Sequence, residues 1–67
     1  MTEDHFNLAV FGPGGLRTTI VREDKESTAR LRRRADTVLT RWQAAEPDTP
    51  FRLEPVAPDG RWSRPWP

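Results

Sequence analysis

The chain has 67 residues, a net charge of +1 and no cysteine. This length allows one small domain, and the lack of cysteine excludes disulfides and a cysteine-based zinc site. A domain of this size buries only about 60% of the surface of its unfolded chain, so its stability depends on dense packing or on burial against a partner.

Export and membrane signals are missing from the sequence. Residues 1–5 are acidic and are not followed by the long apolar stretch of a signal peptide, and no apolar run reaches the ~20 residues of a membrane span. We therefore expect a cytoplasmic protein. Arginine accounts for ten of the eleven basic residues, which the codon usage of a GC-rich bacterial or phage genome explains without a functional role.

The N-terminal part has the pattern of a β-hairpin. Apolar Phe6, Leu8 and Val10 alternate with their neighbours, a period of two that predicts a half-buried strand. The turn-forming residues 12–15, Gly-Pro-Gly-Gly, then break the chain, and the β-branched residues that follow predict a second strand over residues 16–21.

Two loop lengths are compatible with this turn, and they give different registers. A two-residue turn pairs Phe11 with Leu16, whereas a three-residue loop with a left-handed Gly14 pairs Val10 with Leu16. The second register gathers the apolar residues of both strands on one face, so we expect burial to select it.

Residues 24–46 predict one long helix. We expect Asp24 to be its N-cap, Glu26 to pair with Arg30 one turn later, and Pro47 to end it. The apolar residues of this segment recur at spacings of three and four, which makes one stripe: Leu31, Ala35, Val38, Leu39, Trp42 and Ala45.

The last 21 residues hold six of the seven prolines. Residues 51–54 alternate and predict a third strand that Pro55 ends. A turn at residues 57–60 then predicts a short fourth strand over residues 61–64. We expect one domain over residues 1–64 and an extended tail over residues 65–67. The order β-β-α-β, with or without the fourth strand, predicts an α+β fold in which a small antiparallel sheet packs on one long helix.

No constellation of residues indicates catalysis. His5 has no neighbouring nucleophile, and the acidic residues are scattered along the chain. The turn at residues 12–15 leads into a strand rather than a helix and lacks the Lys-Ser/Thr ending of a phosphate loop. We therefore expect no enzyme activity, no cofactor, no metal and no small-molecule substrate.

Positive charge is concentrated on the predicted helix. Residues 30–45 carry five arginines and one acidic residue, whereas the segments on either side are net negative. At 100° per residue, Arg30, Arg34 and Arg41 form a ridge beside the apolar stripe, with Arg33 nearby. Such a ridge is either a solvated face or a contact surface for nucleic-acid phosphates or an acidic protein. Gln43 is the one amide that the helix offers for reading bases.

Two of the three tryptophans, Trp62 and Trp66, lie near the C-terminus on either side of Arg64. Tryptophan and arginine are typical of interface hot spots, although an Arg–Trp stack within the chain is the alternative. Our leading hypothesis is a small accessory or regulatory protein that binds another protein, or a second copy of itself, through this C-terminal segment and the arginine side of the helix. The alternative is a nucleic-acid-binding domain that uses the helix arginines.

Overall fold

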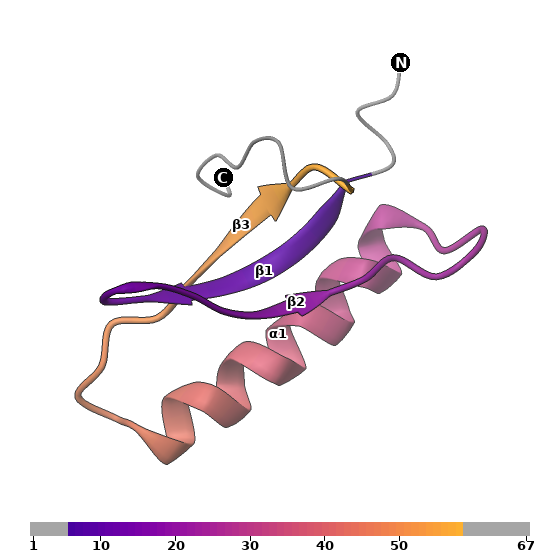
Figure 1. Ribbon diagram of the computed structural model, residues 1–67. Coiled ribbons are helices and arrows are strands. Elements are labelled where there is room, and N and C mark those ends of the chain that lie inside the picture. Colours follow the sequence, from indigo (N-terminus) through magenta and orange to yellow (C-terminus); the bar gives the residue numbers. More distant parts are fainter. Residues whose placement is uncertain (1–5, 59–67) are drawn as a thin grey trace.

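A computed structural model describes residues 6–58 of the chain (Figure 1). Two strands, β1 (Asn7–Gly12) and β2 (Gly15–Ile20), are followed by the helix α1 (Thr28–Ala45) and the strand β3 (Arg52–Val56). The three strands form an antiparallel sheet, and α1 lies along one of its faces. The predicted α+β fold is confirmed. The predicted fourth strand and the tail lie outside the described residues.

The central strand of the sheet is β1, and the order of the strands is β2-β1-β3. Both outer strands are antiparallel to β1. The third strand does not end at Pro55, as the sequence suggested, because Pro55 pairs with Leu8 and the strand continues to Val56. Proline is tolerated here because β3 is an outer strand, where one residue without an N–H group need not break a ladder.

The hairpin register differs from the prediction. Phe11 pairs with Leu16 across a two-residue turn at Pro13-Gly14, so the three-residue loop is wrong. The register then shifts at Arg17, which has no partner, and Val10 faces Thr18. This β-bulge brings Ile20 opposite Leu8 on the core face. Leu16, which we expected on that face, is 58% exposed.

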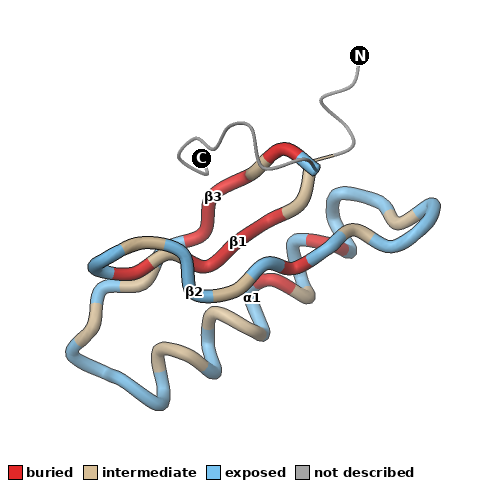
Figure 2. The backbone as a smooth tube through the Cα atoms, viewed as in Figure 1, coloured by how far each residue is buried: buried red, intermediate tan, exposed pale blue. Residues whose placement is uncertain are grey.

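The core lies between the sheet and the N-terminal half of α1 (Figure 2). Leu31 and Ala35 of the helix are fully buried against the apolar residues of all three strands. The buried cluster consists of Leu8, Val10, Ile20, Leu31, Ala35 and Leu53. The predicted helix stripe is confirmed in this half, whereas Val38, Leu39 and Trp42 further along the helix are only partly buried.

The far end of the core is closed by aromatic contacts. Trp42 packs edge-on against Phe51, with 5.7 Å between the ring centroids. The guanidinium of Arg17 also lies over the Phe51 ring, 5.8 Å from its centroid. A Cβ at Gly12 would lie 3.0 Å from both Arg17 and Phe51. The absence of a side chain at Gly12 therefore leaves room for these two side chains to meet over β1. This stack joins the C-terminal half of α1 to the hairpin.

The helix starts later than predicted. Its N-cap is Ser27, whose side chain accepts a hydrogen bond from the Arg30 backbone N–H, and not Asp24. Residues 21–27 instead form an ordered loop, in which Lys25 has a positive φ of 63°. The end agrees with the prediction, since Glu46 is the C-cap and Pro47 follows. Among the described residues, no helix combines the length and apolar character needed to cross a membrane.

Candidate binding surface along the helix

The four helix arginines predicted to form a contact surface do not all remain available. Arg34 holds Glu26 with two nitrogens, Nε and Nη2, each 2.7 Å from a carboxylate oxygen. Its Nη2 also donates to the Val21 carbonyl at 2.7 Å. Glu26 therefore pairs with Arg34 and not with Arg30 as expected. Arg34 connects the helix to the loop and is withdrawn from the ridge.

This ion pair shifts the protonation of both partners. The hydrogen bonds from Arg34, with one from the Glu23 backbone, lower the pKa of Glu26 from 4.5 to about 2. The same contact raises the pKa of Arg34. The Glu26 side chain is only 2% exposed, while that of Arg34 is 36% exposed. The carboxylate is thus shielded by the loop and stays charged because the guanidinium faces it.

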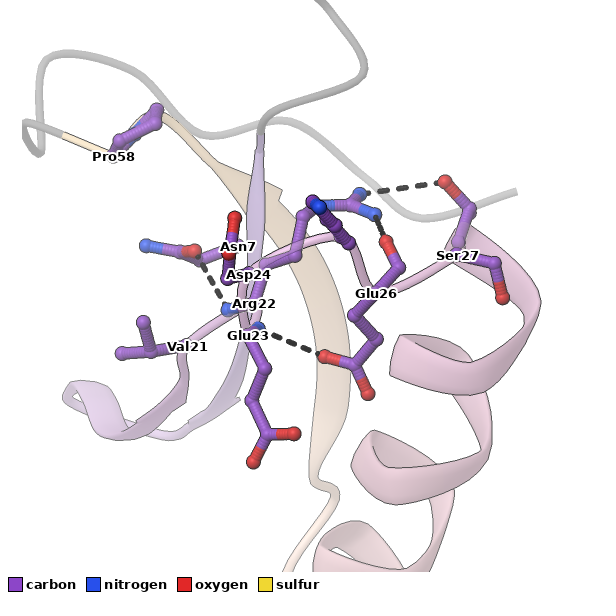
Figure 3. Close-up of a pocket in the computed structure, with 10 residues that line it drawn as sticks. Asn7, Val21, Arg22, Glu23, Asp24, Glu26, Ser27 and Pro58 are labelled. Carbon is purple, nitrogen blue, oxygen red and sulfur yellow. Dashed lines mark hydrogen bonds between the residues drawn. The ribbon is translucent and has the colours of Figure 1, made fainter.

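A second arginine is also used inside the fold. Figure 3 shows Arg22 crossing an open pocket of about 670 Å³ between the loop and the start of the helix. Its side chain donates to the carbonyls of Phe6 and Glu26 and to the Thr28 hydroxyl. Its guanidinium also lies 4.9 Å from the Phe6 ring. The pocket therefore holds a cation whose hydrogen-bonding groups are already engaged.

The remaining three arginines of the predicted ridge face solvent. Arg30, Arg33 and Arg41 are exposed. Their guanidinium groups form no hydrogen bond or ion pair with another residue of the described range 6–58. At 1.5 Å per residue, Arg30 and Arg41 lie about 16 Å apart along the helix axis. We call these three residues the arginine flank.

Two residues of the arginine flank, Arg30 and Arg41, lie on the same side of α1 as Arg34, which is the side that faces strand β2. Arg33 lies opposite Leu31 and Ala35 on the helix and points away from the sheet. Arg34, which neighbours the flank on the helix surface, contacts the carbonyl of Val21 at the end of β2. At the other end of β2, Arg17 reaches Phe51, which packs on Trp42. The helix therefore runs alongside β2 in the opposite direction (Figure 1). This relation between flank and outer strand was not expected from the sequence.

Gln43 does not reach outward to read bases. Its side-chain amide donates to the carbonyls of Glu46, Pro47 and Thr49, the last at 2.6 Å. These three carbonyls belong to the chain that leaves the helix, so Gln43 fixes the path toward β3. The one helix amide suited to adenine is already used in folding.

The outer face of the sheet, opposite α1, carries its own ion pair. Arg52 donates to the buried Glu54 at 2.6 Å and also lies 5.3 Å from the Phe11 ring. This pairing compensates the Glu54 carboxylate and stiffens β3 beside β1. Among the described residues, the large apolar side chains that remain exposed are Leu16 and Val21, at 58% and 61%.

Three further predicted binding residues, Trp62, Arg64 and Trp66, lie outside the described residues. Within residues 6–58, no three His, Cys, Asp or Glu side chains come together as a metal-binding group. Comparison of the chain with protein-family models, curated proteins and solved structures finds no match. The candidate site therefore depends on the arginine flank and its surroundings.

Proposed function

We propose that this domain is a small non-enzymatic accessory or regulatory protein that binds an acidic surface of another protein. The observation that supports the proposal is the arginine flank, in which Arg30, Arg33 and Arg41 are exposed and form no hydrogen bond or ion pair through their guanidinium groups within residues 6–58. Three exposed cations on one helix favour an anionic partner by charge complementarity. Trp62, Arg64 and Trp66 are proposed as a second contact, because tryptophan and arginine are enriched in interface hot spots.

Nucleic-acid binding is the alternative, since the same three arginines suit phosphates. Two features favour a protein partner instead. Arg34 is engaged with Glu26, which leaves three of the four predicted contact arginines for phosphates. Gln43 is engaged with backbone carbonyls, which leaves the helix without an amide to read bases. Any nucleic-acid binding by this face would therefore be weak and independent of sequence.

The two functions are separated by titrating the protein with polyglutamate and with random-sequence duplex DNA at several salt concentrations. Protein binding predicts that polyglutamate binds more tightly and that Arg30→Ala/Arg33→Ala/Arg41→Ala abolishes the interaction. Nucleic-acid binding predicts tighter DNA binding with a log–log salt slope of about −2.7, the value for three phosphate contacts. The proposal fails if neither polymer binds at low salt.

The contribution of the C-terminal segment is tested separately with a chain that lacks residues 65–67. We expect this version to melt close to the intact protein and to bind its protein partner more weakly. A large loss of melting temperature would show instead that Trp66 is part of the core.

A further inference from the structure

Strand β2 leaves one edge of the sheet open. In the order β2-β1-β3 it pairs with β1 on one side, and no strand of the described range 6–58 pairs with its other side. An open edge presents backbone N–H and C=O groups that another chain can bind. The opposite edge is less suitable, because β3 contains Pro55, which lacks an N–H group. The bulge at Arg17 limits the regular part of the open edge to Thr18, Thr19 and Ile20.

The two sides of this edge differ chemically. On the helix side lie Arg30 and Arg41 of the arginine flank, next to Arg34, which donates a hydrogen bond to the Val21 carbonyl. Leu16 pairs with Phe11, so both side chains lie on the outer face of the sheet, away from α1. Val21 follows buried Ile20 directly and is exposed. A strand added here would therefore meet cations on one face and apolar side chains on the other.

We propose that the partner supplies an extended segment that adds to β2 as a further strand. Side chains alternate across a strand, so the segment would direct acidic groups toward the arginine flank and apolar groups toward Leu16 and Val21. This inference rests on the proposed function and specifies its partner. The segment recognised is an acidic-apolar alternating peptide, bound through its backbone at Thr18–Ile20 and selected by charge.

A second copy of the chain fits this edge less well. Antiparallel pairing of two β2 strands across a twofold axis would extend the sheet and place both helices on the same face. The two arginine flanks would then face each other across the new junction, and like charges brought together oppose association. The charge of the helix therefore favours an acidic partner over a homodimer.

The test uses the full chain and four short synthetic peptides of equal length. The first alternates glutamate and valine, and the second has lysine in place of glutamate. The third and fourth keep glutamate and valine but carry N-methyl groups on alternate backbone nitrogens, the third along one edge and the fourth along the other. N-methylation preserves the charges and removes the N–H donors that strand pairing needs. One of these two peptides therefore blocks the edge that faces β2.

We expect the glutamate–valine peptide to bind and to shift the backbone amide signals of Thr18, Thr19 and Ile20 in NMR spectra. The lysine peptide should not bind. One N-methylated version should bind about tenfold more weakly or worse, the change expected from losing one or two backbone hydrogen bonds. Arg30→Ala/Arg33→Ala/Arg41→Ala should weaken binding strongly, whereas Arg32→Ala, on another side of the helix, should change it little.

The outcomes separate this inference from the proposed function. If both N-methylated peptides bind like the parent while the arginine variant loses binding, the flank recognises acidic chains but β2 does not pair, and strand addition is excluded. If no acidic peptide or polyglutamate binds, the proposed function fails as well. If duplex DNA binds through the same arginines and displaces the peptide at lower concentration, a nucleic-acid partner replaces the peptide.

Discussion

Arg34 reaches back from the second turn of α1 to Glu26, and its Nε and Nη2 atoms each lie 2.7 Å from a carboxylate oxygen. Glu26 stands in the loop before the helix, eight residues earlier. The pair, together with the hydrogen bond from Arg34 to Val21, fastens the end of β2 to the helix. It also determines which arginines are left for a partner, because it removes Arg34 from the arginine flank.

Arg34→Ala should lower the melting temperature by several degrees. The substitution leaves the shielded Glu26 carboxylate without its guanidinium partner and the Val21 carbonyl without this donor, and breaking such a pair on one side costs more than the pair itself contributes. Arg33→Ala is the matched control, since it removes the same charge from an exposed position one residue away. Thermal unfolding followed by circular dichroism measures both. Equal melting temperatures for the two variants would contradict the role given to Arg34.

The stability of the fold should decrease in acid through Glu26. Its pKa is lowered in the folded state from 4.5 to about 2. Because the folded-state pKa is the lower one, the unfolded state takes up the proton first as the pH falls. The contribution of the Glu26 carboxylate to the free energy of unfolding is therefore complete above pH 4.5 and is lost as the pH falls toward about 2. Urea unfolding across this pH range should show a steeper loss for the wild type than for Glu26→Gln. Asp48→Asn, which removes an exposed carboxylate, should keep the wild-type pH dependence.

The sequence was sufficient to predict the three strands and the helix of residues 6–58 and their order, because the period-two and helical patterns are local. The link between Glu26 and Arg34 was not predictable in this way. Spacing rules on a helix connect residues three or four apart, and here the partner lies outside the helix in a loop whose shape depends on Arg22 and Lys25. The expected pairing of Glu26 with Arg30 was wrong because the helix begins only at Thr28.

The hairpin shows a second limit of local reasoning. The Pro-Gly pair correctly indicates a turn, but the bulge at Arg17 has no signature in the sequence. Burial of Ile20 opposite Leu8 and the contact between Arg17 and Phe51 both accompany this shift. The open edge of β2 and its position beside the arginine flank follow from this tertiary arrangement, so neither could be inferred from spacing alone.

Leu31→Ala should destabilise the domain more than Leu39→Ala. Leu31 is fully buried among the core residues, whereas Leu39 packs against the core from the C-terminal half of α1 and is only partly buried. Truncating a fully buried leucine costs ~2–5 kcal/mol, a large part of the stability of so small a domain. The free energy of unfolding in urea measures both variants. A loss for Leu39→Ala as large as that for Leu31→Ala would place the centre of the core further along α1 than the structure does.

Gly14→Ala should destabilise the hairpin by about 1–2 kcal/mol, the penalty of an L side chain in a left-handed backbone conformation. Gly14 has a φ of +90° and follows Pro13, the combination of a type II turn, so the predicted positive φ is confirmed although the loop is shorter. A Cβ there would meet nothing within 4 Å, so the cost comes from the backbone and not from a clash. A synthetic chain with D-alanine at this position separates the two causes, since a D residue prefers positive φ. It should melt at or above the wild-type temperature. If the D-alanine chain is destabilised as much as the L-alanine variant, the backbone explanation is wrong.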